Sequence, residues 1–115
     1  DRLARAAAEL PGLETFVCDL ADESDLRRLA AHVRDHLGGL SLLINHAAVQ
    51  HNYTFPGLGN SPDLAVIDAE VQTNFSAAVK LTALCLPMLA QSDGGAVVNV
   101  TSGLALVPKS SAAVY

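Results

Sequence analysis

Three hydroxyl side chains near the end of the chain are the candidates for chemistry. Thr101 and Ser102 directly follow a valine-rich run at residues 96–100, which predicts a buried parallel strand. Because ligands bind outside the carboxyl ends of the strands of an open α/β sheet, hydroxyl groups at this position are well placed to contact one. Tyr115 lies thirteen residues after Ser102. A tyrosine hydroxyl can act as an acid or a base, so proton transfer is the chemistry that this residue type offers.

Each of the polar candidates also has a structural alternative. An isolated loop serine usually bonds its own backbone, and an aromatic residue such as Tyr115 at the end of a chain is often frayed. Asn45 and Asn99, which end two of the predicted strands, are equally well explained as caps of the following loops. Asn74, on an apolar helix face, is open to interpretation as an amide satisfied by backbone groups.

The elements that must position these residues alternate between helices and strands. Asp22 or Ser24 is a candidate N-cap of the second helix, Asp63 caps the third, and Pro87 is expected to kink or loosen its last turn. Such alternation predicts an α/β fold: a parallel sheet with right-handed crossovers and helices on both faces. Helices are expected at residues 1–10, 24–37 and 63–89, and strands at 14–20, 40–44 and 96–100.

Composition narrows the function classes. Half of the 115 residues are hydrophobic, only 4% are aromatic, and the formal net charge is −5, which argues against nucleic acid as a partner. Two cysteines, Cys18 and Cys85, form no disulfide framework and are most simply buried thiols, so we expect a reducing compartment, the cytoplasm. We find neither a signal peptide nor an apolar run of membrane-spanning length, and therefore expect no membrane partner.

The spacing of these motifs resembles that of the short-chain dehydrogenase/reductase family. The family has a serine at the end of its fifth strand and a tyrosine thirteen residues later, as Ser102 and Tyr115 are here. Asn74 is similar to its helix asparagine. The resemblance implies that Tyr115 is the catalytic acid/base and that Ser102 orients the substrate oxygen. It also implies that Asn74 supports a water linked to a lysine four positions beyond the tyrosine.

The same resemblance implies NAD or NADP as cofactor and a small carbonyl or alcohol as substrate. Residues 45–48 read Asn-His-Ala-Ala where the family has Asn-Asn-Ala-Gly, so His46 and Ala48 depart from the pattern. A methyl group at Ala48 narrows the approach of the backbone to the cofactor. Asp19 could equally cap the following turn. The cofactor-binding residues implied are Asp19, Leu20, Asn45, Ala47, Ala48 and Thr101, with Asn99 matching the asparagine before the serine.

The resemblance covers the whole chain, which we interpret as the central part of one NAD(P)-binding Rossmann-like domain, truncated at both ends. This part would hold three strands and three helices of a doubly wound sheet. In the family, three inter-strand steps, roughly 14 Å in all, separate the strand at 14–20 from the one at 40–44. The intervening strands are absent from this chain, so in the chain expressed alone the strand at 14–20 would have two bare edges. We therefore expect the isolated stretch neither to keep the family arrangement nor to show dehydrogenase activity.

Two other readings stay open. One is a nucleotide-binding or regulatory protein without turnover, favoured by His46 and Ala48; the other is an inactive truncation. His32 and His36 lie one helical turn apart and could bind zinc, but a solvated helix face is the simpler reading because no further ligands converge. The family commonly forms homodimers or homotetramers through its long helices, yet packing on the sheet explains the apolar stripes of both predicted helices equally well.

Overall fold

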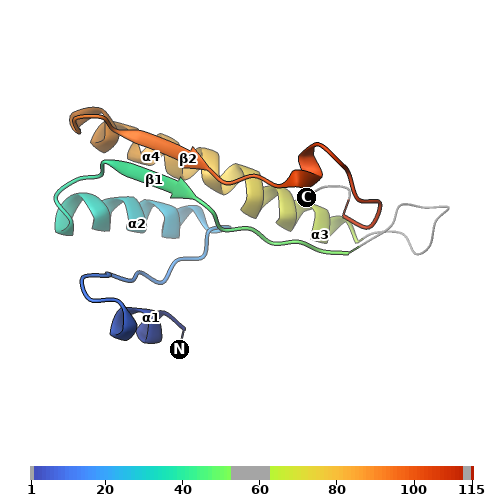
Figure 1. Cartoon of the computed structure of the whole chain (residues 1–115), viewed down its shortest axis with the longest axis horizontal. Coiled ribbons are helices and arrows are strands. Elements are labelled where there is room, and N and C mark those ends of the chain that lie inside the picture. The colour runs from blue at the N-terminus through green and yellow to red at the C-terminus, as the bar shows by residue number, and fades with distance from the viewer. Residues whose placement is uncertain (1, 53–62, 113–114) are drawn as a thin grey trace.

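The computed structural model describes residues 2–52, 63–112 and 115, and its centre is a pair of parallel strands. The elements are α1 (Arg2–Glu9), α2 (Glu23–His36), β1 (Leu42–Asn45), α3 (Leu64–Val71), a π-helical turn (Gln72–Ser76), α4 (Ala77–Gln91), β2 (Ala96–Asn99) and a 3-10 turn (Gly103–Ala105). α1 lies apart from the other elements, and a long extended segment joins it to α2 (Figure 1). The predicted helices and the last two predicted strands are confirmed, with ends shifted by a few residues.

β1 and β2 pair in parallel although 50 residues lie between the end of β1 and the start of β2. The helices between the two strands form the crossover. Leu42 pairs with Ala96 and Asn45 with Asn99. Two further bonds extend the ladder, from Ala96 N to the Ser41 oxygen and from Val100 N to the Asn45 oxygen, both 2.9 Å long. Both strands therefore point the same way, and their carboxyl ends lie at one edge of the sheet.

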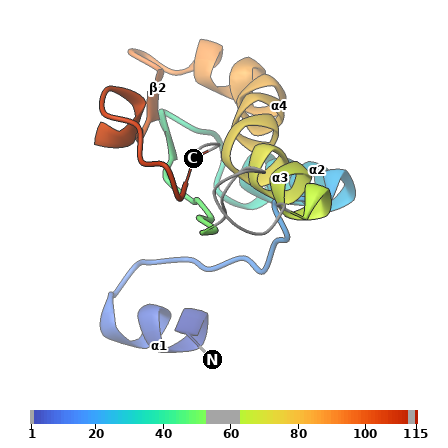
Figure 2. The same cartoon turned by 90° about the vertical axis from the view of Figure 1, so that its right-hand side faces the viewer.

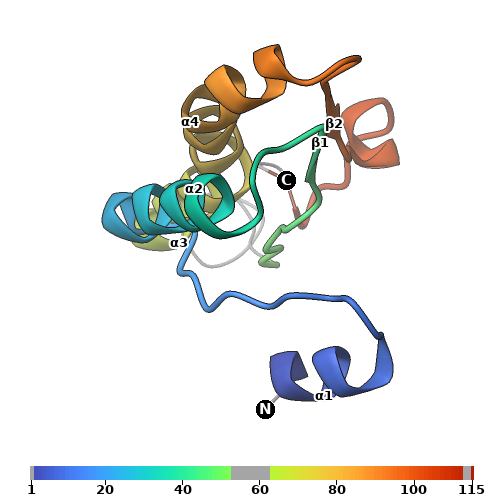
Figure 3. The same cartoon turned by 90° about the vertical axis from the view of Figure 1, so that its left-hand side faces the viewer.

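One face of this sheet is covered by α4, with α2 packed beside α4 (Figures 2 and 3). The core joins buried Ala30 of α2 to buried Cys85 and Leu89 of α4, and Leu43 and Val97 of the strands pack against them. The opposite face is apolar and open among the described residues: Leu42, Ile44 and Val98 are 46%, 56% and 45% exposed. Strands that are apolar on both faces are typical of parallel sheets. Helices were predicted on both faces of the sheet, and among the described residues they cover only one.

The predicted strand at residues 14–20 is wrong. These residues form an extended segment without ladder bonds, because β1 and β2 pair only with each other and no described strand lies beside the segment. The segment instead lies along α2. The Phe16 ring is 4.9 Å from the His32 ring and 5.5 Å from the Arg28 guanidinium carbon, and His32 Nε2 lies 2.6 Å from Glu14 Oε1.

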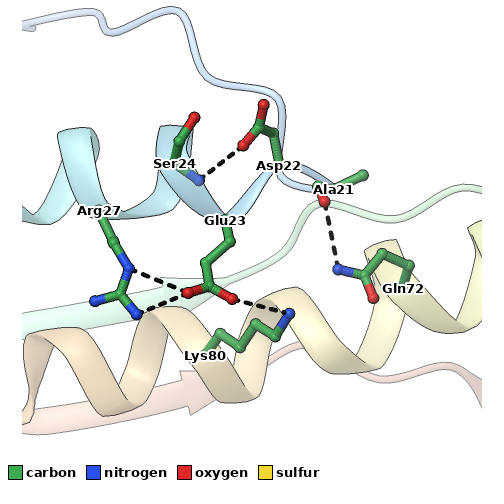
Figure 4. A network of polar contacts seen from close by, with 7 residues as sticks. All are labelled: Ala21, Asp22, Glu23, Ser24, Arg27, Gln72 and Lys80. Atoms are coloured by element: carbon green, nitrogen blue, oxygen red, sulfur yellow. Dashed lines mark hydrogen bonds and ion pairs between the residues drawn. The ribbon is translucent and has the colours of Figure 1, made fainter.

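α2 begins where Asp22 caps it: its Oδ1 accepts a hydrogen bond from Ser24 N at 2.7 Å. This bond lowers the pKa of the Asp22 carboxyl. Polar contacts then join the helix to the α4 region (Figure 4). Glu23 lies 2.7 Å from Arg27 and 3.7 Å from Lys80 of α4, and Gln72 Nε2 donates to the Ala21 oxygen at 3.4 Å. Because these groups are exposed, the contacts align the helices more than they stabilise them.

The third predicted helix is interrupted by the π-helical turn, which the apolar pattern did not indicate. Asp63 caps the helix as predicted, its Oδ1 accepting from Ala65 N at 3.0 Å. α4 continues past Pro87 to Gln91, so the main departure from regular α-helix lies at Gln72–Ser76 and not at the proline. A π-helical turn inside a helix often marks a functional site.

The whole helical region Leu64–Gln91 is 28 residues long and, by length and composition, could cross a membrane. The expectation that no apolar run reaches this length is therefore wrong. A mostly buried core helix of a soluble protein passes the same test; here α4 contacts α2, β1 and β2, and 17% of the most apolar window is buried. One such helix is weak support for a membrane span.

Candidate active site

The two strand ends are joined by the side chain of Asn45. Its Nδ2 donates to Asn99 Oδ1 at 2.8 Å and to Thr82 Oγ1 of α4 at 3.1 Å. Asn45 and Asn99 are register partners at the carboxyl ends of β1 and β2. Both asparagines are therefore involved in a contact between strands and helix, and not only in caps of their own loops.

A pocket of about 700 Å³ lies at these strand ends, between the strands and the α3–α4 helical region. Alanines form much of its wall, together with the larger apolar Phe75, Val79 and Leu86. Its polar groups come from both strand ends, the helices and the C-terminal segment: Asn45, Asn74, Thr82, Asn99, Thr101, Ser102 and Tyr115. A mostly apolar concave site with a few convergent polar groups is typical of a small-molecule site.

Ser102 makes the local backbone bond of the structural alternative and also lies at the pocket. It caps the 3-10 turn Gly103–Ala105, its Oγ accepting from Leu104 N at 3.2 Å, and it also lines the pocket. A hydroxyl that accepts a bond through a lone pair keeps its proton for donation. The capping bond therefore holds Ser102 Oγ at the pocket while leaving a donor for a ligand.

Tyr115 lines the same pocket and is half-buried, which differs from the frayed terminus that its sequence position suggested. In Figure 2 the C-terminal end lies between the strands and α4, and in Figure 1 it lies beyond the carboxyl ends of β1 and β2, beside the 3-10 turn and α3. Ala47, Ala48 and Thr101 are in the lining as well. The structure thus brings most of the predicted site residues to one cavity.

Asn74 lies in the π-helical turn and holds the segment that follows β1. Its Nδ2 donates to the Val49 oxygen at 2.7 Å, and its Oδ1 accepts from Val49 N at 2.8 Å. Its amide is thus satisfied by backbone groups, the structural alternative noted above. Support of a lysine-linked water by Asn74 stays a prediction.

Asp19 and Leu20 lie outside the pocket lining. Asp19 Oδ1 accepts from Ala21 N at 2.9 Å, so its carboxylate caps the turn that leads to α2. Its backbone N–H donates to Asp25 Oδ2, also at 2.9 Å. A part in cofactor binding for these two residues stays a prediction.

Two residues near the site carry no recognisable signal in the sequence. Glu70 of α3 is fully buried, and its Oε1 accepts from His51 N at 3.2 Å. Its Oε2 has no hydrogen-bond partner among the described residues. The second residue is Thr82, whose Oγ1 accepts a hydrogen bond from Asn45 Nδ2. Neither lies in a recognisable motif, because each acts on a partner distant in the sequence.

His32 and His36 stack with ring centroids 4.6 Å apart, on the side of α2 that faces residues 14–17. Within residues 2–52, 63–112 and 115, no group of three or more His, Cys, Asp or Glu side chains is arranged to hold a metal ion. The zinc alternative therefore finds no support in the described geometry.

The chain is similar in sequence and in structure to several known proteins. A protein of Bacillus subtilis named as the uncharacterized oxidoreductase DltE is 37% identical over 114 residues, which are 99% of this chain and 44% of that protein. A short chain dehydrogenase from Burkholderia cenocepacia J2315, solved in complex with NADP, superposes with a TM-score of 0.71 at 25% identity. That match covers 83% of this chain and 36% of the other.

A ligand-free aldohexose dehydrogenase of Thermoplasma acidophilum superposes with a TM-score of 0.80 over 92% of this chain and 41% of the other. At 17% identity this match shows the fold alone, a Rossmann-type α/β fold. The chain thus spans less than half the length of these relatives. The model of the short chain dehydrogenase family matches residues 1–115, so the chain belongs to that family.

Proposed function

We propose that the chain carries the reaction site of an oxidoreductase that transfers a hydride between NAD(P)(H) and a carbonyl or alcohol. The observation that carries the proposal is that Ser102 and Tyr115 line one pocket at the carboxyl ends of two parallel strands. Relatives named as oxidoreductases and a structural neighbour that binds NADP support it. Because those relatives are about twice as long, we also propose that residues 1–115 are the central part of one NAD(P)-binding domain, inactive by itself.

The residues present fit a nicotinamide dinucleotide. Ala47 and Ala48, which follow β1, place nothing larger than methyl groups at the pocket wall, although the Ala48 methyl leaves less room beside the backbone than a glycine would. Asn45 and Thr101 add polar groups beside them. We assign these four residues to dinucleotide binding, and Asp19 with Leu20 to its adenine end outside the pocket. The dinucleotide, when bound, supplies or accepts the hydride.

The chain's own hydroxyl groups handle the oxygen of the substrate. The Ser102 hydroxyl, held by its bond from Leu104 N, donates to the substrate oxygen and stabilises the negative charge that develops there. The Tyr115 hydroxyl gives a proton to that oxygen in reduction and takes one in oxidation. The apolar side chains Phe75, Val79 and Leu86 form the pocket wall around this exchange. Both free thiols, half-buried Cys18 and buried Cys85, support the further proposal of a reducing compartment.

The test uses the full-length natural protein and a Tyr115→Phe variant. Turnover is followed by the loss of reduced-nicotinamide absorbance with a panel of aldehydes, ketones and quinones, and dinucleotide affinity by fluorescence titration. We expect wild-type turnover, a loss of about 10²–10⁴-fold in kcat for Tyr115→Phe, and little change in dinucleotide Kd. Near-normal kcat in the variant would refute the role of Tyr115. Dinucleotide binding without turnover of any carbonyl would favour the alternative, a non-catalytic nucleotide-binding protein.

A further inference from the structure

The Asn45 amide forms a junction among three elements that lie far apart in the sequence. One nitrogen, Nδ2, carries two hydrogens, and both are used: one by Asn99 Oδ1 at 2.8 Å and one by Thr82 Oγ1 at 3.1 Å. We call Asn45, Thr82 and Asn99 the strand-end junction. All three residues line the pocket.

Each member of the junction directly precedes or supports a part of the proposed site. Asn45 is followed by the segment that contains Ala47 and Ala48, and Asn99 by the segment that contains Ser102. The hydrogen bond between the Asn45 and Asn99 side chains thus fixes the distance between these two segments where they leave the strands. Thr82 attaches that pair to α4, in the same continuous helical region that holds Val49 through Asn74.

We propose that Thr82 is a positioning residue: its hydroxyl oxygen fixes the Asn45 amide, and through it the placement of Ser102 relative to the opposite wall of the pocket. This inference rests on the proposed function. Thr82 acts through Asn45 and Asn99 and takes no part in proton or hydride transfer. Its contribution is geometric, because small displacements of a group that binds the reacting oxygen lower the rate steeply.

The hydroxyl, and not the bulk of the side chain, carries this role. Valine has the shape of threonine without the oxygen, so Thr82→Val leaves one Asn45 Nδ2 hydrogen unpaired in a half-buried setting. The amide is then held by Asn99 alone, so its orientation is less restricted. Serine keeps the oxygen and loses only a methyl group, so Thr82→Ser restores the bond. Thr15→Val is the matched control, because Thr15 is half-buried and lies outside the pocket lining.

The experiment compares wild type, Thr82→Val, Thr82→Ser and Thr15→Val in the full-length natural protein. It measures kcat and KM for carbonyl reduction, Kd for the reduced dinucleotide, and the amide chemical shifts of the Asn45 side chain and the Ser102 backbone without ligand. For Thr82→Val we expect a fall in kcat of about tenfold, a rise in Kd that is smaller than this fall because Asn45 is one of four residues assigned to the dinucleotide, and shifts at both amides. Thr82→Ser and Thr15→Val are expected to behave as wild type.

Wild-type kcat in Thr82→Val, or equal impairment of the valine and serine variants, would overturn the inference. Should the wild type turn over no carbonyl, the proposed function fails and the chemical shifts decide the inference by themselves. In that case a Ser102 amide that stays unshifted in Thr82→Val overturns it. A shift in Thr82→Val that is absent from Thr82→Ser supports it.

Discussion

The side-chain amide of Asn74 bonds both polar groups of the Val49 backbone, donating to its oxygen at 2.7 Å and accepting from its N–H at 2.8 Å. A neighbouring strand makes the same pair of bonds to a residue at a sheet edge. The helix thus takes the place of a strand along the segment that follows β1. Asn74 lies in the π-helical turn, so the irregular part of the helix is also the part that holds the pocket wall.

Replacing Asn74 should therefore loosen the segment after β1. Asn74→Leu removes both bonds and leaves two backbone groups of Val49 unpaired, so we expect a loss of about 2 kcal/mol in the free energy of unfolding. Urea denaturation of the full-length protein measures this. Gln72→Leu, in the same turn, is the control: Gln72 makes one longer bond, 3.4 Å, and its loss should cost clearly less. Equal effects of the two substitutions would contradict the role given to Asn74.

Glu70 offers a second prediction because its buried carboxylate has only one hydrogen bond among the described residues, from His51 N. Glutamine supplies the same acceptor without the desolvation cost of a carboxylate. We expect Glu70→Gln to match or exceed wild type in free energy of unfolding. Glu70→Ala should lose about 2 kcal/mol, since it leaves His51 N unpaired and opens a cavity. A glutamine variant as unstable as the alanine variant would show that Oε2 has a partner essential to the fold.

Ser102 should contribute to rate far more than to dinucleotide binding. In the full-length protein, we expect Ser102→Ala to lower kcat by about 10²–10³-fold, the effect of removing one donor to a developing negative charge. Ser102→Asp separates the two roles of the residue. It keeps an acceptor for Leu104 N but has no proton to donate when ionised, so it should be at least as inactive. Ser41→Ala, at an exposed serine, is the control and should keep wild-type kcat.

The thiol of Cys85 should react slowly near neutral pH. Burial raises the pKa of the Cys85 thiol above its ordinary value of 9.0, so the reactive thiolate is scarcer in the folded protein. At a pH between the unfolded and the folded pKa, the Cys85 thiol keeps its proton in the folded state and loses it in the unfolded state. The free energy of unfolding therefore falls as the pH rises through that range. Iodoacetamide labelling against pH, in a Cys18→Ser background, should show Cys85 modified only at high pH or in urea. Rapid labelling at pH 7 in native buffer would contradict this.

Much of the local structure could be predicted from sequence. The caps Asp22 and Asp63, the helices they begin and the two valine- and leucine-rich strands depend on neighbours within a few positions. The spacing of Ser102 and Tyr115 similarly pointed to one site, and both line one pocket. These features need only short-range periodicity and the rule that parallel strands end at the same edge of a sheet.

The predicted strand at 14–20 shows where such reasoning stops. Its β-branched and aromatic residues favour an extended backbone, and the segment is extended, but a strand exists only where a neighbour accepts and donates ladder bonds. Here no described strand lies beside it, and Phe16 packs on α2 instead. The π-helical turn is a similar case, because no residue type in Gln72–Ser76 signals it.

Residue types and their periodicity are enough to show which segments are helical or extended and which polar residues end the strands. The contacts of Asn45 with Thr82, of Asn74 with Val49 and of Glu70 with His51 follow instead from the packed fold. The physical reason is that these bonds join residues 19 to 37 positions apart, and which atoms meet depends on how α3 and α4 pack against the strands.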